Sequence, residues 1–375
     1  MIYLDNAATT AMSEVAINAL IKISSVQYGN PSAIYGFGRK TKDILENARR
    51  IIAGCIGAEP EEIYFTSCGT ESDNWVIQQV SNGYDKLITS KVEHHAILHP
   101  AERLGDKTVY LSVDSECMVS EETLKEALDG KKTIVSIMMQ NNETGAIQNI
   151  KELAEKVHLD NPDSIFHTDA VQAVGHIRID VKELGVDMLS ASAHKFNGPK
   201  GVGFIFIDKN CKIKPFIIGG GQEKGMRSGT ENVAGIYSMA KALEDNVSKL
   251  DEIHDKVDGL EQLLFEQLST NGIEYRVNGN SANRAKGVIN LAIEGLDGEG
   301  LMNMLDMHDI CISIGSACNS KSQDRSHVLL AMGLDETVID SSVRISIGRF
   351  NTEDDISELV KWIASFKRIA LLADS

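Results

Sequence analysis

The chain has 375 residues, of which 42% are hydrophobic and 24% are charged, and its formal net charge is −17. Such a chain forms a substantial hydrophobic core, and its length favours one large and one smaller domain. The strong negative charge argues against nucleic acid as a partner. The N-terminus, MIYLDNAATT, lacks the charged and apolar regions of a leader, and no apolar run is long enough to span a bilayer. We therefore expect a cytoplasmic protein with no membrane or nucleic-acid partner.

The cysteines are scattered along the chain without any C-x-x-C pair. This spacing indicates neither a disulfide framework nor a zinc ribbon, and we expect no metal site. Most of the thiols are expected to be small buried hydrophobic groups, although at least one has surroundings that suit a working thiol. The six residues are Cys55, Cys68, Cys117, Cys211, Cys311 and Cys318.

Short β-rich runs alternate with segments of helical spacing in the first two thirds of the chain. The pattern predicts an α/β fold with a seven-stranded, mostly parallel sheet covered on both faces, and ligand sites in such sheets lie beyond the carboxyl ends of the strands. The predicted strands are 62–67, 86–90, 108–113, 133–139, 164–170, 187–193 and 201–207. The predicted helices between them are 71–81, 94–104, 120–129 and 150–159.

The pattern changes after the seventh strand. A long helical periodicity runs over 231–269, and new strands are predicted at 287–293 and 342–347, which indicates a smaller α+β domain. Periodicity alone does not assign the first dozen residues. We assign 13–255 to the large domain, and 1–12 with 256–375 to the small one.

A lysine lies just past a predicted buried strand in SAHKFNGPKGVGF, residues 192–204. Near an apolar strand end the ammonium group of Lys195 loses solvation, which lowers its pKa and makes the neutral amine available to attack an aldehyde. This setting favours a Schiff base on Lys195. The alternative is a lysine that extends to solvent from the start of a loop.

An aspartate ends another predicted buried strand in FHTDAVQAVG, residues 166–175. An ionised Asp169 in this position would keep a pyridinium ring protonated, so that the ring withdraws electrons from a substrate carbanion, and Gln172 follows three positions on. The alternative for Asp169 is a helix N-cap.

A strand also runs into small and hydroxyl residues in FTSCGTESDN, residues 65–74. The free N–H groups of the following helix, the hydroxyl of Thr70 and the close backbone approach allowed by Gly69 all suit a phosphate. Ordinary helix capping would use the same residue types.

Two adjacent histidines follow a strand in KVEHHAILHP, residues 91–100. Adjacent imidazoles diverge and no third ligand of suitable spacing is apparent, so we expect His94 to stack on a flat cofactor rather than to bind a metal. A proton relay through His94 is also open. His95 and His99 are interpreted as structural.

Two further residues lie near the C-terminus. Cys318, in GSAC, is flanked by small and polar residues that offer no apolar packing, so we interpret it as an exposed nucleophile. Arg344, in SSVRISIGRF, lies in a strand pattern where its guanidinium suits a bidentate contact with a substrate carboxylate.

These motifs occur in a fixed order together with YLDNAATT (3–10), GNPS (29–32), QNNETG (140–145) and GGGQEKGMRSGTEN (219–232). The ordered set resembles the cysteine desulfurases of the NifS/IscS type, a branch of the class-V aminotransferase family with the fold-type I architecture of pyridoxal phosphate (PLP) enzymes. The resemblance covers nearly the whole chain. No single motif is as specific as the ordered set.

The resemblance implies PLP on Lys195, with Asp169 at the pyridine nitrogen and His94 stacked on the ring. It implies a homodimer in which a threonine of the partner subunit reaches the phosphate, and Thr230 matches that threonine. The remaining implied contacts are Gly69, Thr70, Ser192 and His194 at the phosphate, Asn142 and Gln172 near the phenolic oxygen, and Arg344 with Asn142 at the substrate.

The implied reaction converts L-cysteine to L-alanine and a persulfide on Cys318, with Lys195 and His94 as the other catalytic residues. The sulfur then passes to an acceptor protein, such as an iron-sulfur scaffold. The long segment after the cysteine implies a mobile loop at about 315–327. The chain departs from the family pattern at Tyr35, where many relatives have histidine, and at Cys68, where glycine is usual.

Other functions remain open at this point. A selenocysteine lyase or a small-amino-acid aminotransferase would use the same scaffold. A non-catalytic protein that binds a metal or an iron-sulfur cluster is the alternative from another class. The need for a thiol separates the desulfurase from the aminotransferase.

Overall fold

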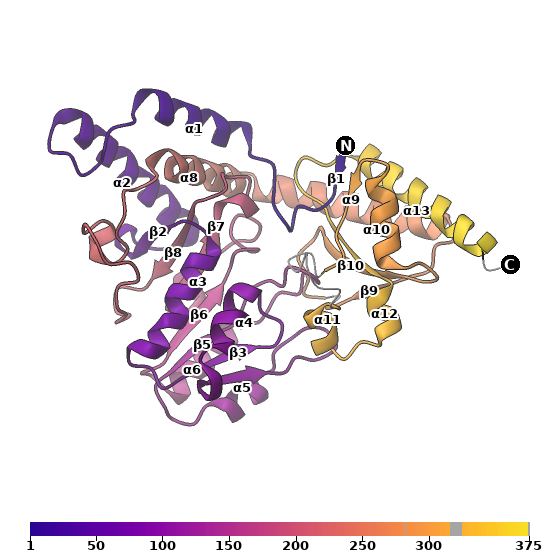
Figure 1. The fold of residues 1–375 in the computed structure, drawn as a ribbon, viewed down its shortest axis with the longest axis horizontal. Coiled ribbons are helices and arrows are strands. Elements are labelled where there is room, and N and C mark those ends of the chain that lie inside the picture. Colours follow the sequence, from indigo (N-terminus) through magenta and orange to yellow (C-terminus); the bar gives the residue numbers. More distant parts are fainter. Residues whose placement is uncertain (281, 316–324, 374–375) are drawn as a thin grey trace.

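The computed structural model describes residues 1–280, 282–315 and 325–373. Figure 1 shows a larger unit built around one sheet and a smaller unit beside it, and both chain termini lie at the smaller unit. The predicted α/β class is confirmed, since seven strands form a mixed, mostly parallel sheet.

The large sheet contains all seven strands predicted in the first two thirds of the chain. Neighbouring strands are parallel except that β8 runs antiparallel to both β7 and β2. In sheet order the strands are β2 (Ile63–Thr66), β8 (Gly203–Ile207), β7 (Met188–Ser192), β6 (Ile165–Asp169), β5 (Thr133–Ser136), β3 (Lys86–Ser90) and β4 (Thr108–Leu111).

Both faces of this sheet are buried, because successive side chains of each strand point to opposite faces. On β7, Met188 packs into the cluster that contains α3 (Gly69–Gln78) and α4 (His95–Glu102), whereas Leu189 packs into the cluster of α2 (Gly36–Ile56), α6 (Ile150–Asp160) and α8 (Val233–Ser248). Phe204 and Ile205 of β8 alternate in the same way. The near-continuous apolar strands of the sequence follow from this double burial.

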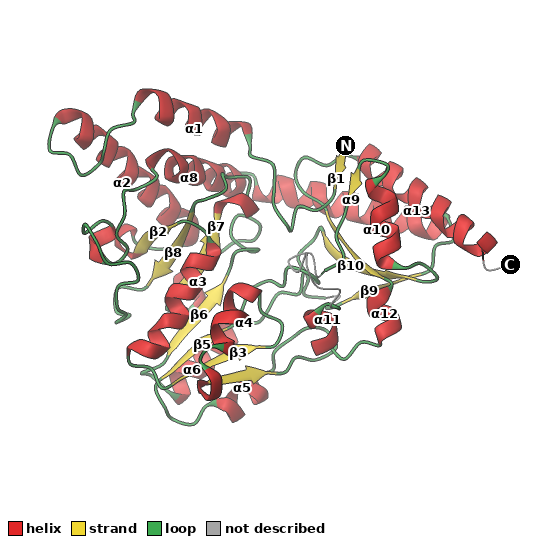
Figure 2. Cartoon of the chain, viewed as in Figure 1, coloured by secondary structure: helices red, strands yellow, loops and turns green. Residues whose placement is uncertain are grey.

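Helices cover the sheet on both sides (Figure 2). Helices α3 (Gly69–Gln78) and α4 (His95–Glu102) cover one face. The helices that contribute to the other face are α1 (Glu14–Val26), α2 (Gly36–Ile56), α5 (Glu121–Ala127), α6 (Ile150–Asp160), α7 (Val181–Leu184) and α8 (Val233–Ser248).

The smaller unit has its own apolar cluster, built on a three-stranded antiparallel sheet of order β12-β10-β9 and a two-stranded parallel pair. The strands are β9 (Tyr275–Asn278), β10 (Val288–Ile293), β12 (Ser342–Ser346), β1 (Ile2–Tyr3) and β11 (Ile310–Cys311). The helices are α9 (Leu250–Thr270), α10 (Gly298–Asp306), α11 (His327–Ala331), α12 (Glu336–Asp340) and α13 (Glu353–Ala373).

The long helix expected over 231–269 is two helices. Lys249 leaves the helical conformation, with φ −113° and ψ 16°, so α8 ends before it and α9 begins after it. Helix α8 packs into the core of the large unit and α9 into that of the small one. The expected domain boundary after residue 255 lies within α9, and this division stays a prediction.

No helix in the described part of the chain is both long enough and apolar enough to cross a membrane.

Candidate functional site

The expected site residues follow strands that end at one edge of the large sheet. Because β2, β3, β5, β6 and β7 run in one direction, their carboxyl ends share that edge. The residues that follow those ends are Gly69 after β2, His94 after β3, Asn142 after β5, Gln172 after β6 and Lys195 after β7.

Lys195 lies in a 3-10 turn, Ala193–Lys195, directly after β7. Its Nζ donates to the carbonyl oxygens of Ala7 at 2.6 Å and Ala8 at 2.9 Å. The side-chain amide of Gln172 donates to the same Ala7 oxygen at 2.9 Å. The N-terminal segment therefore crosses from the small unit to the edge of the large sheet and holds the lysine there.

Asp169 ends β6 and is buried, and its Oδ1 accepts a hydrogen bond from the backbone N–H of Val171 at 2.9 Å. Burial raises the pKa of Asp169 to about 6, while the hydrogen bond from Val171 and the positive charge of Lys195 act in the opposite direction. Lys195 is thus within electrostatic reach of Asp169. The pair brings together the amine and the carboxylate that the sequence predicted separately.

Two further carboxyl groups, Asp73 and Glu93, are buried close to Asp169. Burial and the charge of Asp169 raise the pKa of Asp73 well above its usual value. Burial also raises the pKa of Glu93 to about 8, although its Oε1 accepts from Ser90 Oγ at 2.6 Å. Like charges in one apolar site do not all ionise. The raised pKa of Glu93 keeps this group protonated at neutral pH, and burial together with the charge of Asp169 disfavours ionisation of Asp73, so the negative charge lies mainly on Asp169.

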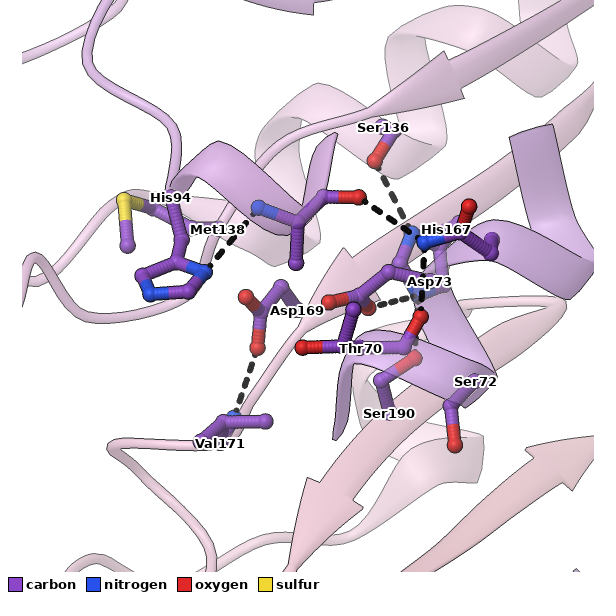
Figure 3. Close-up of polar contacts among 12 residues, drawn as sticks. Thr70, Ser72, Asp73, His94, Ser136, Met138, His167, Asp169, Val171 and Ser190 are labelled. Atoms are coloured by element: carbon purple, nitrogen blue, oxygen red, sulfur yellow. Dashed lines mark hydrogen bonds and ion pairs between the residues drawn. The ribbon is translucent and has the colours of Figure 1, made fainter. Parts of the chain in front are cut away.

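A buried histidine, His167, lies beside Asp73 (Figure 3). The two ring nitrogens of His167 are each 2.9 Å from a hydroxyl, Nδ1 from Ser136 and Nε2 from Ser190. Asp73 Oδ1 lies 3.8 Å from His167 Nε2. Burial lowers the pKa of His167 to about 3, so the imidazole is neutral and the two serines fix its orientation.

His94 is the N-cap of α4, where its Nδ1 accepts from Ala96 N at 3.1 Å (Figure 3). Burial, followed by the charge of Lys195, lowers its pKa to about 4, so His94 is a neutral imidazole beside the lysine at neutral pH. His95 instead stacks on His99, with ring centroids 4.6 Å apart, and lies 4.9 Å from His327. No group of three or more histidine, cysteine or carboxylate side chains among the described residues is arranged to hold a metal ion.

The N-terminus of α3 closely approaches the loop after β6 and the end of β7. A Cβ placed on Gly69 would be 2.6 Å from Val171 Cγ2, so glycine is required for α3 to approach the loop after Asp169. The same Cβ would be 3.7 Å from Ser192 Cβ. The Ser192 hydroxyl is buried and has no hydrogen-bond partner in the described part of the chain. Thr70 is exposed in the first turn of α3.

His194 adds a ring nitrogen close to Lys195. Its Nδ1 is 3.1 Å from Thr9 Oγ1, and burial with the charge of Lys195 lowers its pKa to about 4. His194 is therefore neutral at neutral pH.

The small unit brings Arg344 to the same edge. Arg344 lies on β12 with a buried side chain, whose Nη2 donates to Asp5 Oδ1 at 2.6 Å and whose Nη1 donates to the carbonyl oxygen of Asn142 at 2.9 Å. The side chain of neighbouring Asn141 fixes the turn, since its Oδ1 accepts from the N–H groups of Glu143 and Thr144. Asn142, which is only half buried, lies beside the arginine.

One expected site residue, Thr230, is not brought into this group. Thr230 is exposed in the loop before α8, a loop whose Arg227 pairs with Glu71 of α3 at 2.6 Å. Cys318 and most of its expected loop lie outside the described residues. Their roles stay predictions.

The sequence interpretation missed Asp5, Asp73, Glu93 and His167, although each lies inside a quoted motif. The available signal was a charged or polar residue within or next to a strand expected to be buried, because such a group needs a partner or a shifted pKa. These residues were overlooked because their motifs were interpreted through helix capping, or through His94 and Asp169.

A model of the aminotransferase class-V family matches residues 2–359. Among curated proteins, the cysteine desulfurase IscS of Clostridium botulinum is 42% identical over 369 residues, which cover 96% of this chain and 92% of that protein. The cysteine desulfurase IscS of Methanosarcina thermophila is 42% identical over 367 residues, with coverage of 96% and 90%.

Solved structures agree with these relatives. A NifS-like protein superposes with a TM-score of 0.91 at 35% identity, covering 98% of this chain and 99% of that chain. The apo cysteine desulfurase of Thermococcus onnurineus NA1 superposes with a TM-score of 0.86 at 25% identity, with coverage of 98% and 94%. With a family match over almost the whole length and the sheet-edge arrangement described above, the chain belongs to the class-V aminotransferase family, in the group that contains the NifS-like and IscS proteins.

Proposed function

We propose that this protein is a PLP-dependent cysteine desulfurase, which converts L-cysteine to L-alanine and takes the sulfur as a persulfide on Cys318. The observation that carries the proposal is the position of Lys195, directly after β7 and within electrostatic reach of the buried carboxylate of Asp169. The 42% identity to a cysteine desulfurase over 96% of the chain also supports the proposal.

Class-V aminotransferases use PLP, and the buried groups of this chain fit that cofactor. The Ser192 hydroxyl has no partner among the described residues, and it lies beside the helix N-terminus at Gly69, where a phosphate would accept hydrogen bonds from both. Asp169 offers a carboxylate to a ring nitrogen, and Lys195 offers an amine to an aldehyde. When bound, PLP supplies the electron sink for charge that develops at the substrate α-carbon.

Each proposed role uses a property of the residue itself. Lys195 would accept the proton from the substrate α-carbon. Asp169 would keep the ring nitrogen of the cofactor protonated, and neutral His94 would pack against the ring. Gly69, Thr70, Ser192 and His194 would hold the phosphate; Gln172 and Asn142 would contact the phenolic oxygen; Arg344, with Asn142, would bind the substrate carboxylate.

The sulfur step requires a thiolate at Cys318. Its sulfur attacks the sulfur of the bound cysteine, so that an S–S bond forms while the C–S bond breaks, and the electron pair of that bond is left on carbon. A proton then completes the methyl group of alanine. The persulfide sulfur passes to an acceptor protein, for which we propose an iron-sulfur scaffold in view of the IscS names of the relatives.

We also propose a homodimer. Large apolar side chains are exposed along α1, the following loop and the start of α2, which is typical of an interface. Thr230 is exposed in a separate loop, as is required of a residue that reaches the site of a partner subunit. Sedimentation is expected to give a mass near twice the 40.9 kDa of one chain. The exposed residues include Ile17, Ile21, Val26, Tyr28, Ile34 and Tyr35.

The direct test of the function is an assay of the purified holoenzyme with L-cysteine. We expect L-alanine and sulfide in equal amounts when a thiol reductant releases the persulfide, and labelled sulfur on the protein when no reductant is present. Formation of pyruvate, or transfer of the amino group to a 2-oxo acid, would contradict the proposal in favour of another PLP activity.

Asp169 is expected to destabilise the cofactor-free protein. Because burial raises its folded-state pKa from 3.8 to about 6, ionised Asp169 costs roughly 3 kcal/mol of folding free energy above about pH 6. Asp169→Asn removes that cost, so the cofactor-free variant should unfold at higher denaturant concentration than the wild type at pH 7.5. The difference should shrink as pH falls below about 6 and disappear only by about pH 3, below the unfolded-state pKa of 3.8, because folded and unfolded states are then both protonated.

Asp114 provides the matched control for this prediction. Its Oδ1 accepts a backbone hydrogen bond two residues on, from Glu116 N at 2.9 Å, as Asp169 does from Val171, but Asp114 is exposed. Asp114→Asn should therefore leave stability unchanged at both pH values. An equal stabilisation by the two substitutions would mean that burial of Asp169 is not the cause.

A further inference from the structure

The substrate-facing arginine proposed above is already paired with a carboxylate of its own chain. Arg344 is 3% exposed, and its Nη2 donates to Asp5 Oδ1 at 2.6 Å. The carbonyl oxygen of Asn142 accepts from Nη1 at 2.9 Å, and Nε is buried without a partner in the described part of the chain. Each terminal nitrogen of the guanidinium therefore already has a hydrogen-bond acceptor, Asp5 for Nη2 and Asn142 for Nη1.

The backbone on both sides of Asp5 is anchored. Leu4 N donates to Cys311 O at 2.9 Å, Ser346 N donates to Leu4 O at 2.7 Å, and Asn6 N donates to Ser346 O at 3.2 Å. The Asp5 side chain, by contrast, retains 17% of its exposure. A rotation about the Asp5 side-chain bonds would uncover the arginine while the strand contacts stay in place.

The segment that carries Asp5 also contacts the lysine that acts on the substrate. Two and three residues beyond Asp5, the carbonyl oxygens of Ala7 and Ala8 accept from Lys195 Nζ. An amino acid whose α-proton is taken by Lys195 therefore has its carboxylate close to this segment. The chemistry of that carboxylate is the same as that of Asp5.

We propose that Asp5 is an internal stand-in for the substrate carboxylate, which occupies Arg344 until an amino acid displaces it. This inference rests on the proposed role of Arg344. With Asp5 in place the buried guanidinium keeps a counter-ion before substrate arrives, because an unpaired buried charge is costly. The incoming carboxylate has to replace Asp5, because two carboxylates on one guanidinium repel each other. This competition lowers the affinity of the protein for any ligand that binds Arg344 through a carboxylate.

The test is a spectrophotometric titration of the holoenzyme with L-alanine and with ethylamine, which lacks only the carboxylate. Asp5→Asn keeps the size and the acceptor oxygen of the side chain but removes its charge. The dissociation constant for L-alanine should fall by about fivefold or more, while that for ethylamine stays unchanged. Asp5→Glu, which keeps the charge, should bind both ligands as the wild type does.

Unchanged or weaker binding of L-alanine to Asp5→Asn would overturn the inference, because an aspartate that only orients Arg344 has that effect. Asp5→Ser provides a second neutral variant, and thermal unfolding of each variant checks the fold. Arg344→Gln should raise the dissociation constant for L-alanine by about tenfold or more without affecting ethylamine. If it does not, the role of Arg344 and this inference fail together, whereas the assay of sulfide and alanine tests the desulfurase activity separately.

Discussion

Replacement of Lys195 by alanine is expected to abolish both the cofactor colour and the activity. The variant lacks the amine that forms the Schiff base and accepts the α-proton, so its visible absorption band should be absent and sulfide release from L-cysteine should fall by about 10³-fold or more. Absorption spectra and a sulfide assay on the same preparation measure the two effects. The motif SAHKFNGPKG and the position of Lys195 directly after β7 both indicate this lysine.

Lys200 is the matched control for this substitution. It lies five residues further along the same loop and is exposed, whereas Lys195 Nζ is bonded to the carbonyl oxygens of Ala7 and Ala8. Lys200→Ala should therefore keep the colour and the activity. A Lys195→Ala protein that retains its visible band, or loses it only through unfolding, would contradict the assignment, so circular dichroism of the variant accompanies the spectra.

The part of the site that follows single strands was predictable from sequence. The strand expected at 86–90 is β3 (Lys86–Ser90), and Asp169 and Lys195 were identified because each follows an apolar run. In a sheet buried on both faces the apolar run and its polar end are local features. The parallel arrangement then brings those ends to one edge, so that local patterns predict a three-dimensional cluster.

The part that depends on distant segments was not predictable in this way. Arg344 and Asp5 are 339 positions apart, and nothing in either motif indicates their ion pair. The shared burial of Asp73, Glu93 and Asp169 is also a tertiary effect, since helix α3, the loop after β3 and the end of β6 contribute them. The break at Lys249 was missed because the apolar spacing continues across it, although α8 and α9 pack into different cores.

Replacement of Cys318 by alanine is expected to separate amino-acid binding from sulfur transfer. The residue lies outside the described part of the chain, so the expectation rests on its small and polar flanks and on the family motif GSAC. Sulfide release from L-cysteine should fall by about 10³-fold or more, because no other group receives the sulfur. The spectral change on adding L-alanine should remain, because Lys195, Asp169 and Arg344 are intact. An aminotransferase needs no thiol, so unchanged turnover in this variant would contradict the desulfurase mechanism.

Substitutions of Cys68 and Cys311 test whether the loss of activity is specific to the Cys318 thiol. Cys68 is the N-cap of α3, beside the proposed phosphate site, and Cys311 is half buried on β11, seven residues before Cys318. Cys311→Ala should leave sulfide release unchanged, since burial has already raised the pKa of this thiol and disfavours its thiolate. Cys68→Ala should at most weaken PLP binding, and excess cofactor should restore its activity. The opposite result would be loss of sulfide release in Cys68→Ala at saturating PLP and normal sulfide release in Cys318→Ala. Because the reaction requires one thiolate beside the bound cysteine, that result would make Cys68 the sulfur acceptor.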